Sequence, residues 1–147
     1  LILKAQAQAD TRFHIDLRCR DIMSKDVLCL YEDEDIQVAV EKFKQVNLMS
    51  LPVLNRAEQV CGTLALYEVV EWFQKATDLR TSWQDQVKHI MKRQVVTVQP
   101  DQELQDLIPY FVERSFNYIP VVENKALVGI ISRADMIAAL YRLLQHR

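Results

Sequence analysis

The sequence repeats itself after about 68 residues, and this repeat constrains the fold more than any other feature of the chain. Met91 follows Met23 by 68 residues (91 − 23), and Pro120 follows Pro52 by the same interval (120 − 52). A repeat of this length indicates that one structural unit occurs twice, and that each copy buries part of its apolar surface against its neighbour. We therefore expect two similar units rather than one unrelated globule.

Apolar residues keep the same helical spacing in both copies. A helix in each copy has apolar residues at positions i, i+3, i+4 and i+7, which line one face. These residues are Ile36, Ala39, Val40 and Phe43 in the first copy, and Leu104, Leu107, Ile108 and Phe111 in the second. The helix that closes each copy has another apolar stripe, which we predict to face the core: Val69, Val70 and Phe73, and then Met136, Ile137 and Leu140.

Short apolar runs between polar turns predict the strands. In the first copy they cover residues 27–30, 51–54 and 60–66, and a helix from about Asp35 separates the first two. We predict an α+β fold of two intertwined βαββα repeats related by an approximate twofold axis, with an N-terminal helix before them. The predicted boundaries are 1–19 for the N-terminal linking helix, 20–77 for repeat 1, 78–87 for a polar connector and 88–147 for repeat 2.

Pro109 breaks the helical pattern of repeat 2. Proline has no backbone N–H, and its ring clashes with the preceding turn of a helix. We therefore expect a bend between Gln105 and Pro109.

The composition is that of an ordinary soluble globular protein. Half of the residues are hydrophobic, 26% are charged and the formal net charge is −2. This charge predicts no broad attraction to nucleic acid or anionic membranes, so we expect neither as a partner. Cys19, Cys29 and Cys61 form neither a C-x-x-C motif nor a group with histidines, so we expect reduced thiols and no metal site. No apolar run is long enough to cross a bilayer, and we expect a cytoplasmic protein or the cytoplasmic part of a membrane protein.

A candidate binding site lies where the last predicted strand meets the closing helix of repeat 2. The apolar run 127–131 leads directly into a helix at Ser132, and Asp135 follows three residues later. The unpaired N–H groups of a helix N-terminus favour an anion, and the carboxylate suits diol hydroxyls. The same Ser-x-x-Asp spacing is typical of a helix capping box. Both interpretations stay open from this stretch alone.

Taken in order, these motifs resemble a tandem of cystathionine-β-synthase (CBS) domains, the pair often called a Bateman module. The resemblance covers residues 20–144 and rests on D-I-M-S-K-D-V and H-I-M-K-R-Q-V-V-T-V at the repeat starts, L-P-V-L and I-P-V-V in mid-repeat, and G-I-I-S-R-A-D at the end. It implies a regulatory binding module, usually attached to an enzyme, channel or transporter and often paired into homodimers. Because the chain starts at Leu1 rather than at a methionine, we expect it to be part of a longer protein, with a membrane or catalytic domain upstream.

The resemblance also implies a ligand and the residues that hold it. Modules of this family commonly bind AMP, ADP, ATP or S-adenosylmethionine as regulatory ligands, and no cofactor is required. The family pattern h-x-S/T-x-x-D falls on Ser132 and Asp135, which are expected to contact phosphate or ribose. Arg133 suits phosphate, although a lone arginine is more often a solvated surface charge. The base is expected to lie beside backbone groups of Thr97 and Val98 and apolar contacts from Ile119, Pro120 and Val121.

Repeat 1 departs from this pattern. It has Ala65 at the position of the serine and Glu68 at the position of the aspartate. Alanine has no hydrogen-bonding side chain, and the carboxylate of glutamate lies one bond further from the backbone. We expect one competent site in repeat 2 and a degraded or repurposed site in repeat 1.

No catalytic constellation is apparent. Ser132 has no histidine partner by motif, and His14, His89 and His146 lie in unrelated contexts. The chain contains neither G-x-G-x-x-G nor G-x-x-x-x-G-K-[ST], so we expect a binding module rather than an enzyme. Two hypotheses remain: a sensor of adenosine-containing ligands, and a ligand-free dimerisation or docking module, which the degraded site of repeat 1 favours.

Overall fold

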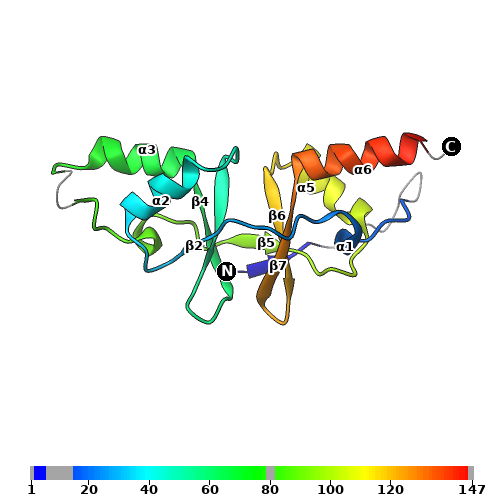
Figure 1. The fold of residues 1–147 in the computed structure, drawn as a ribbon, viewed down its shortest axis with the longest axis horizontal. Coiled ribbons are helices and arrows are strands. Elements are labelled where there is room, and N and C mark those ends of the chain that lie inside the picture. Colours follow the sequence, from blue (N-terminus) through cyan, green and yellow to red (C-terminus); the bar gives the residue numbers. More distant parts are fainter. Residues whose placement is uncertain (1, 6–14, 79–81, 146–147) are drawn as a thin grey trace. The chain divides into compact units, whose positions relative to one another are not determined.

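The contacts of the chain divide it into two compact units, each built from two separate stretches of sequence (Figure 1). The computed structural model describes residues 2–5, 15–78 and 82–145. Unit 1 contains Leu1–Ile2 and Leu28–Val95, and unit 2 contains Leu3–Val27 and Val96–Arg147. The opening residues of each repeat therefore belong to the unit built mainly from the other repeat, so the repeats are intertwined as predicted. Because of this exchange, the limits of the units differ from the limits of the sequence repeats.

Unit 1 is built around a three-stranded sheet. Its strands, in sheet order, are β2 (Leu30–Tyr31), β3 (Ser50–Leu54) and β4 (Val60–Ala65). Strand β2 is parallel to β3, and β3 is antiparallel to β4. Its helices are α2 (Ile36–Phe43), α3 (Leu66–Lys75) and the 3₁₀ helix η1 (Val87–His89). Residues from all these elements form one apolar core.

Unit 2 repeats this order. Its strands are β1 (Ile2–Lys4), β5 (Val95–Thr97), β6 (Tyr118–Glu123) and β7 (Ala126–Ser132), and the first two begin one residue before the unit limit. Strand β1 pairs with β5, and β6 is antiparallel to β7. Val98, directly after β5, forms a parallel bridge to Val121 of β6. The helices are α1 (Cys19–Ile22), η2 (Leu104–Leu107), α5 (Ile108–Val112) and α6 (Arg133–Gln145).

Both glycines lie where an exchanged segment pairs with the last strand of a unit. Beside each glycine, strand and segment exchange backbone hydrogen bonds with N–O distances of 2.9 Å. A Cβ atom at Gly62 would lie 2.7 Å from the carbonyl oxygen of Lys92, and one at Gly129 would lie 2.9 Å from that of Ser24. Only glycine allows so close an approach without a shift of the backbone.

The stripes predicted for the first helix of each repeat contribute to the cores. The fully buried members are Ile36, Ala39 and Phe43 in unit 1, and Leu104 and Leu107 in unit 2. The partly buried members, which pack against the same cores, are Val40, Ile108 and Phe111.

The closing helices expose most of the stripe that was predicted to face the core. Val69 and Met136 are buried as predicted. The prediction was wrong for four residues, whose exposed fractions are 64% for Val70, 54% for Phe73, 66% for Ile137 and 39% for Leu140. Trp72 and Ala139 are buried instead, because residues three apart, 69 with 72 and 136 with 139, lie on the same side of a helix. Each closing helix therefore has a second apolar side that is exposed.

The helical segment around Pro109 changes from 3₁₀ to α geometry, and the bend predicted between Gln105 and Pro109 stays a prediction. The 3₁₀ helix η2 ends at Leu107, and Pro109 lies in the first turn of α5, where the missing N–H costs no hydrogen bond. The equivalent residues of unit 1 form the continuous helix α2.

The prediction of an N-terminal helix was wrong where the structure describes that segment. Residues Ile2–Lys4 form strand β1, and residues 15–17 have no regular structure. Residues 6–14, on which the prediction also falls, lie outside the described residues. Pairing with the edge of β5 outweighs the local helix propensity of this stretch.

The described residues include no helix with the length and hydropathy that a bilayer span requires. Across the same residues, no group of three or more His, Cys, Asp or Glu side chains is placed to hold a metal ion. The three cysteines have free thiols. Burial raises the pKa of Cys19 and of Cys61 to about 12, so both thiols stay protonated near neutral pH.

Candidate ligand-binding site

The junction between β7 and α6 forms a reciprocal capping box. The backbone N–H of Ser132 donates to Oδ2 of Asp135 at 2.8 Å, and the backbone N–H of Asp135 donates to Oγ of Ser132 at 3.2 Å. Two of the N–H groups that a helix start leaves without partners are thereby satisfied. The capping interpretation of Ser-x-x-Asp is confirmed, and contact with a ligand stays a prediction.

The Asp135 carboxylate also accepts two serine hydroxyls. Ser132 Oγ donates to Oδ2, and Ser24 Oγ, from the exchanged segment, donates to Oδ1, both at 3.0 Å. A carboxylate accepts at about four lone-pair positions, and three donors are already present. One acceptor position on this carboxylate is therefore left for a further donor. Sequence reasoning missed Ser24. The only feature of the sequence that could have indicated it is its position just after the start of repeat 1, before the first predicted strand.

Arg133 fixes the start of α6 to the loop before β6. Its Nε donates to the carbonyl oxygen of Phe116 at 2.9 Å, and its backbone N–H donates to that of Asn117 at 3.2 Å. The side chain is exposed, and its terminal guanidinium nitrogens have no partner among the residues that the structure describes. Those nitrogens remain available to an anion at the helix N-terminus.

The residues predicted to contact the base lie inside the sheet of the same unit. The N–H of Val98 donates to the carbonyl oxygen of Pro120 at 3.0 Å, and the carbonyl oxygen of Val98 accepts from Val122 at 2.8 Å. Thr97 and Val98 are 1% and 0% exposed. Ile119, Pro120 and Val121 are also buried. The structure thus brings all the predicted residues into unit 2, but only the junction residues Ser132, Arg133 and Asp135 are accessible.

The equivalent junction in repeat 1 keeps only half of the box. The N–H of Ala65 donates to Oε1 of Glu68 at 2.8 Å, and Ala65 has no side-chain oxygen that could accept a hydrogen bond from the backbone of Glu68. Lys92 occupies the position of Ser24 (92 − 24 = 68). Its Nζ lies 5.0 Å from the ring centroid of Tyr67, and a hydrogen bond with Tyr67 raises the pKa of Lys92. Burial raises the pKa of the Glu68 carboxyl.

Larger side chains surround the junction of repeat 1 than the junction of repeat 2. A cavity of about 390 Å³ there is lined by Tyr67, Glu68, Glu71, Trp72, Lys75, His89, Ile90 and Lys92. With Ala65 and Ser132 as equivalent positions, an offset of 67 (132 − 65), the positions of Tyr67, Glu71 and Trp72 are all alanines in repeat 2: Ala134, Ala138 and Ala139. Repeat 1 therefore cannot form the serine and aspartate cluster, and its site is chemically different.

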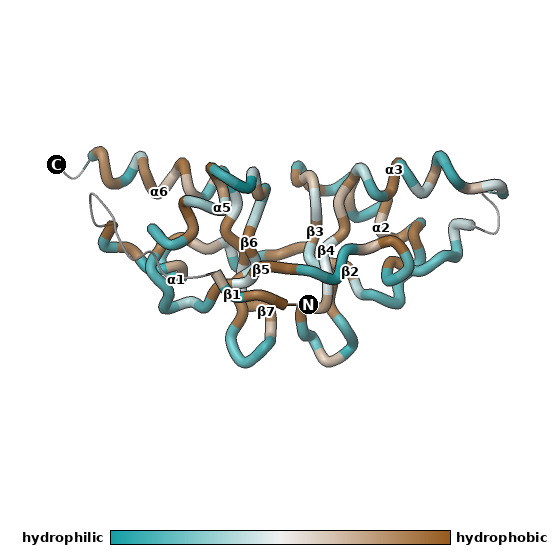
Figure 2. Tube along the Cα trace, turned by 180° about the vertical axis from the view of Figure 1, so that it is seen from behind, coloured by the Kyte–Doolittle hydropathy of each residue, from teal (hydrophilic) through white to brown (hydrophobic). Residues whose placement is uncertain are grey.

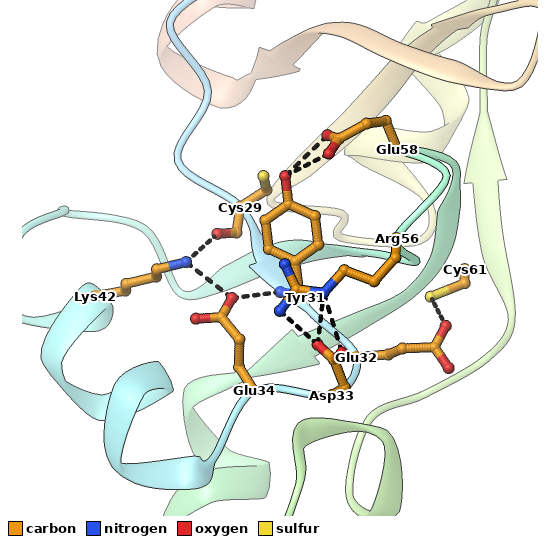
Figure 3. A network of polar contacts seen from close by, with 9 residues as sticks. All are labelled: Cys29, Tyr31, Glu32, Asp33, Glu34, Lys42, Arg56, Glu58 and Cys61. Atoms are coloured by element: carbon orange, nitrogen blue, oxygen red, sulfur yellow. Dashed lines mark hydrogen bonds and ion pairs between the residues drawn. The ribbon is translucent and has the colours of Figure 1, made fainter.

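Unit 1 also carries a polar network around Tyr31 that sequence reasoning missed (Figure 3). The Tyr31 hydroxyl donates to Glu58 at 2.7 Å, and the guanidinium carbon of Arg56 lies 4.3 Å from the centre of the Tyr31 ring. Arg56 pairs with Asp33 at 2.8 Å. The hydrogen bond from Arg56 lowers the pKa of Asp33, and the bond to Glu58 raises the pKa of Tyr31.

Unit 2 has a cavity at the place of this network. Gln99, Asp101 and Asn124 occupy the positions of Tyr31, Asp33 and Arg56, each 68 residues later (99 − 31, 101 − 33 and 124 − 56). They help to line a cavity of about 230 Å³. The loss of the stacked tyrosine and arginine leaves this space open, so the two units differ at this end of their sheets as well.

The family model for the CBS domain matches the chain twice, at residues 19–75 and 87–142, which together make up more than half of it. The chain belongs to the CBS domain family. The two matches make it a tandem CBS pair, which confirms the resemblance drawn from the repeat motifs.

Several proteins resemble this CBS pair in sequence. MJ1426 of Methanocaldococcus jannaschii is 24% identical over 151 residues, which cover 82% of this chain and 89% of that protein. MJ1225 of the same organism is 30% identical over 121 residues, with 82% of this chain and 42% of that protein covered. The carnitine transport ATP-binding protein OpuCA of Listeria monocytogenes is 26% identical over 121 residues, 82% of this chain and 28% of that protein. The chain thus spans less than half the length of the latter two.

Solved structures share the fold. The structure of CBSX2 in complex with AMP has a TM-score of 0.74 and 19% identity, with 86% of this chain and 97% of that chain covered. A CBS domain protein from Streptococcus pneumoniae TIGR4 has a TM-score of 0.72 and 22% identity, with 84% and 86% covered. These structures confirm the predicted α+β class of a CBS pair.

Proposed function

We propose that this CBS pair is a regulatory module that binds an adenosine-containing nucleotide at the strand-to-helix junction of repeat 2. The observation that carries the proposal is the Asp135 carboxylate, on which two serine hydroxyls and one backbone N–H converge at 2.8–3.0 Å. The capping box uses the Ser132 N–H as donor and Ser132 Oγ as acceptor of the Asp135 N–H, and it requires no hydroxyl donor on the carboxylate. Two hydroxyl donors on both oxygens match the chemistry of a ribose diol, which would replace them.

The same junction suits the phosphate of such a ligand. Helix α6 is 13 residues long, and the N-terminus of a helix favours an anion through its dipole and its free N–H groups. The exposed guanidinium of Arg133 lies beside that N-terminus and can donate to phosphate oxygens. The AMP complex of CBSX2, which has a similar fold, gives the proposal further support.

A thermal-shift series with AMP, ADP, ATP and S-adenosylmethionine tests the proposal. A ligand at one hundred times its Kd stabilises the folded state by about 2.7 kcal/mol, which raises Tm by several degrees for a chain of this size. We expect Asp135→Ala to abolish the shift and Glu68→Ala, the matched change in repeat 1, to retain it. No shift with any of the four ligands, or an equal shift in Asp135→Ala, would overturn the proposal.

Binding becomes regulation only if the ligand prefers one of two states of the protein. The chain corresponds to 28% of OpuCA, a carnitine transport ATP-binding protein. We place this CBS pair in a similar setting, as a part of a longer transporter or enzyme whose activity responds to occupancy of the junction. Comparing the activity of the full-length protein with and without nucleotide tests this part of the proposal.

A second function, self-association into a homodimer, is favoured by the exposed sides of α3 and α6. Both helices have exposed apolar residues at equivalent positions: Val70 and Phe73 on α3, and Ile137 and Leu140 on α6. Figure 2 shows apolar residues along both helices. Large apolar side chains that gather on a surface mark interaction sites, and a side that recurs in both repeats suits a second copy of the chain.

Sedimentation equilibrium tests self-association. We expect a dimer for the parent chain and a shift to monomer for Val70→Lys combined with Ile137→Lys. Asn47→Lys, an exposed change outside both helices, is the control for added charge. A parent chain that stays monomeric at high concentration would rule out this second function without affecting the nucleotide proposal.

A further inference from the structure

We infer that strand β1 is an internal competitor of the nucleotide, because it covers the backbone edge at Thr97 beside which the base is expected to lie. This inference rests on the proposed function. It adds a regulatory element that lies outside the strand-to-helix junction and belongs to the chain itself.

Three hydrogen bonds attach the end of β1 to its neighbours in unit 2. The N–H of Ala5 donates to the carbonyl oxygen of Thr97 at 2.9 Å, and the Thr97 hydroxyl donates to the carbonyl oxygen of Leu3 at 3.4 Å. The side-chain amide of Gln102 donates to the carbonyl oxygen of Ala5 at 2.9 Å. Ala5 is 6% exposed and belongs to the apolar core of this unit.

No ligand atom can reach the Thr97 carbonyl oxygen while this strand is in place. Thr97 is 1% exposed, and the N–H of Ala5 already donates to its oxygen. An exocyclic amino group of a purine is the same kind of donor as that backbone N–H. The strand therefore satisfies the acceptor that a base would use, and one donor replaces the other.

Strand β1 is also the part of this edge that can leave most easily. Val98, directly after β5, is fixed by backbone bonds to Pro120 and Val122 of β6. By contrast, β1 has three residues, all with exposed side chains. Short edge strands with few buried contacts open first in native proteins. Detaching β1 together with Ala5, which belongs to the apolar core, uncovers Thr97 and breaks no backbone hydrogen bond between β6 and β7.

Competition of this kind lowers the apparent affinity of the module by the fraction of molecules in which β1 is detached. Nucleotide binding in turn shifts residues 2–5 from the strand to a free segment. The state of residues 2–5 thus depends on whether nucleotide is bound. Any interaction that keeps these residues paired with β5 weakens nucleotide binding.

Calorimetric titrations with AMP and with ATP test the inference on three versions of the chain. Ala5→Pro removes the N–H that donates to Thr97, and we expect it to tighten nucleotide binding on the order of tenfold. Lys4→Ala, on the same strand, keeps every backbone bond, and we expect its affinity to match the parent. Equal affinities for Ala5→Pro and the parent would overturn the inference and leave the proposed function standing. Failure of AMP and ATP to bind any version would overturn the inference, and failure of ADP and S-adenosylmethionine as well would overturn the proposed function.

Hydrogen exchange at the Ala5 amide of the parent chain gives a readout that does not depend on a variant. We expect saturating AMP to speed the exchange of this amide, because the ligand takes over the Thr97 carbonyl oxygen as its acceptor and leaves the amide without a partner. Slower or unchanged exchange with bound nucleotide would show that β1 stays in place, and the inference would then be wrong.

Discussion

The two strand-to-helix junctions have the same backbone and different side chains. In repeat 2 the N–H of Arg133 donates to the carbonyl oxygen of Asn117, and in repeat 1 the N–H of Leu66 donates to that of Met49. Each junction also has a carboxylate that accepts the N–H of the last strand residue at 2.8 Å. The shared backbone shows that this fold starts its closing helix without any serine. Ser132 caps the helix, but the fold does not require the Ser24 hydroxyl on Asp135, and the proposed ligand binding would account for it.

Repeat 1 has replaced this chemistry rather than only lost it. Lys92 takes the place of Ser24 and lies over the ring of Tyr67, and Glu68 carries a carboxyl whose pKa burial raises. A lysine and a tyrosine in unit 1 occupy the positions that Ser24 and Ala134 have in unit 2. The comparison teaches that the duplicated backbone is the same at both junctions, and that the side chains alone make their chemistry different.

The largest loss of stability is expected for substitutions at the two glycines, where both repeats should respond alike. Gly129→Ala and Gly62→Ala each place a Cβ within 3 Å of a backbone oxygen of the exchanged segment. Overpacking of this kind costs about 1–3 kcal/mol of the free energy of unfolding, which urea denaturation measures. A loss in only one of the two variants would show that the segments are not equivalent, and would break the comparison on which the assignment of the junctions depends.

A smaller difference should separate the two carboxylates. Asp135→Ala removes both the acceptor of the helix cap and the partner of two serine hydroxyls, and we expect a loss of about 0.5–2 kcal/mol in the free energy of unfolding. Glu68→Ala removes the acceptor of one N–H and should cost less. Thermal denaturation without ligand compares the two, and an equal or larger loss for Glu68→Ala would contradict the hydrogen-bond pattern described for Asp135.

The smallest expected effect is a change with pH in the stability that Glu68 contributes. Burial raises the pKa of Glu68 above its ordinary value of 4.5, so the folded state favours the protonated carboxyl. The stabilisation from this group is complete below its unfolded pKa and is lost as the pH rises through the folded pKa. Glu68→Gln keeps an oxygen for the Ala65 N–H but cannot ionise, so its stability relative to the parent should rise as the pH increases above about 4.5. Urea denaturation from pH 4 to pH 7 measures this difference, and a parallel course of the two proteins would refute it.

Much of the fold could be predicted from the sequence, because each element predicted in one repeat can be checked against the equivalent residues of the other. The offset of 68, which becomes 67 from the last strand of each repeat onward (129 − 62), placed the paired strands and the first helices, and Pro109 marked the change from η2 to α5. The outer sides of α3 and α6 could not be predicted, because apolar residues at helical spacing look the same whether they face a core or a partner. Strand β1 was missed because its conformation depends on pairing with β5, more than 90 residues away in the chain.

The candidate site was predictable only in part. Ser132 and Asp135 lie three residues apart, so their contact follows from the local spacing of a helix start. The hydroxyl of Ser24 reaches Asp135 across 111 residues, because the opening segment of each repeat is exchanged between units. No local sequence pattern predicts such an exchange of segments between units. The burial of Thr97 under β1 likewise depends on a pairing between distant segments.

Calorimetric titration of the whole chain with the nucleotide that gives the largest thermal shift tests the asymmetry of the two repeats most directly. We expect one nucleotide per chain, no binding in Asp135→Ala, and unchanged binding in Glu68→Ala. Two equivalent sites per chain, or binding that survives in Asp135→Ala and disappears in Glu68→Ala, would contradict it.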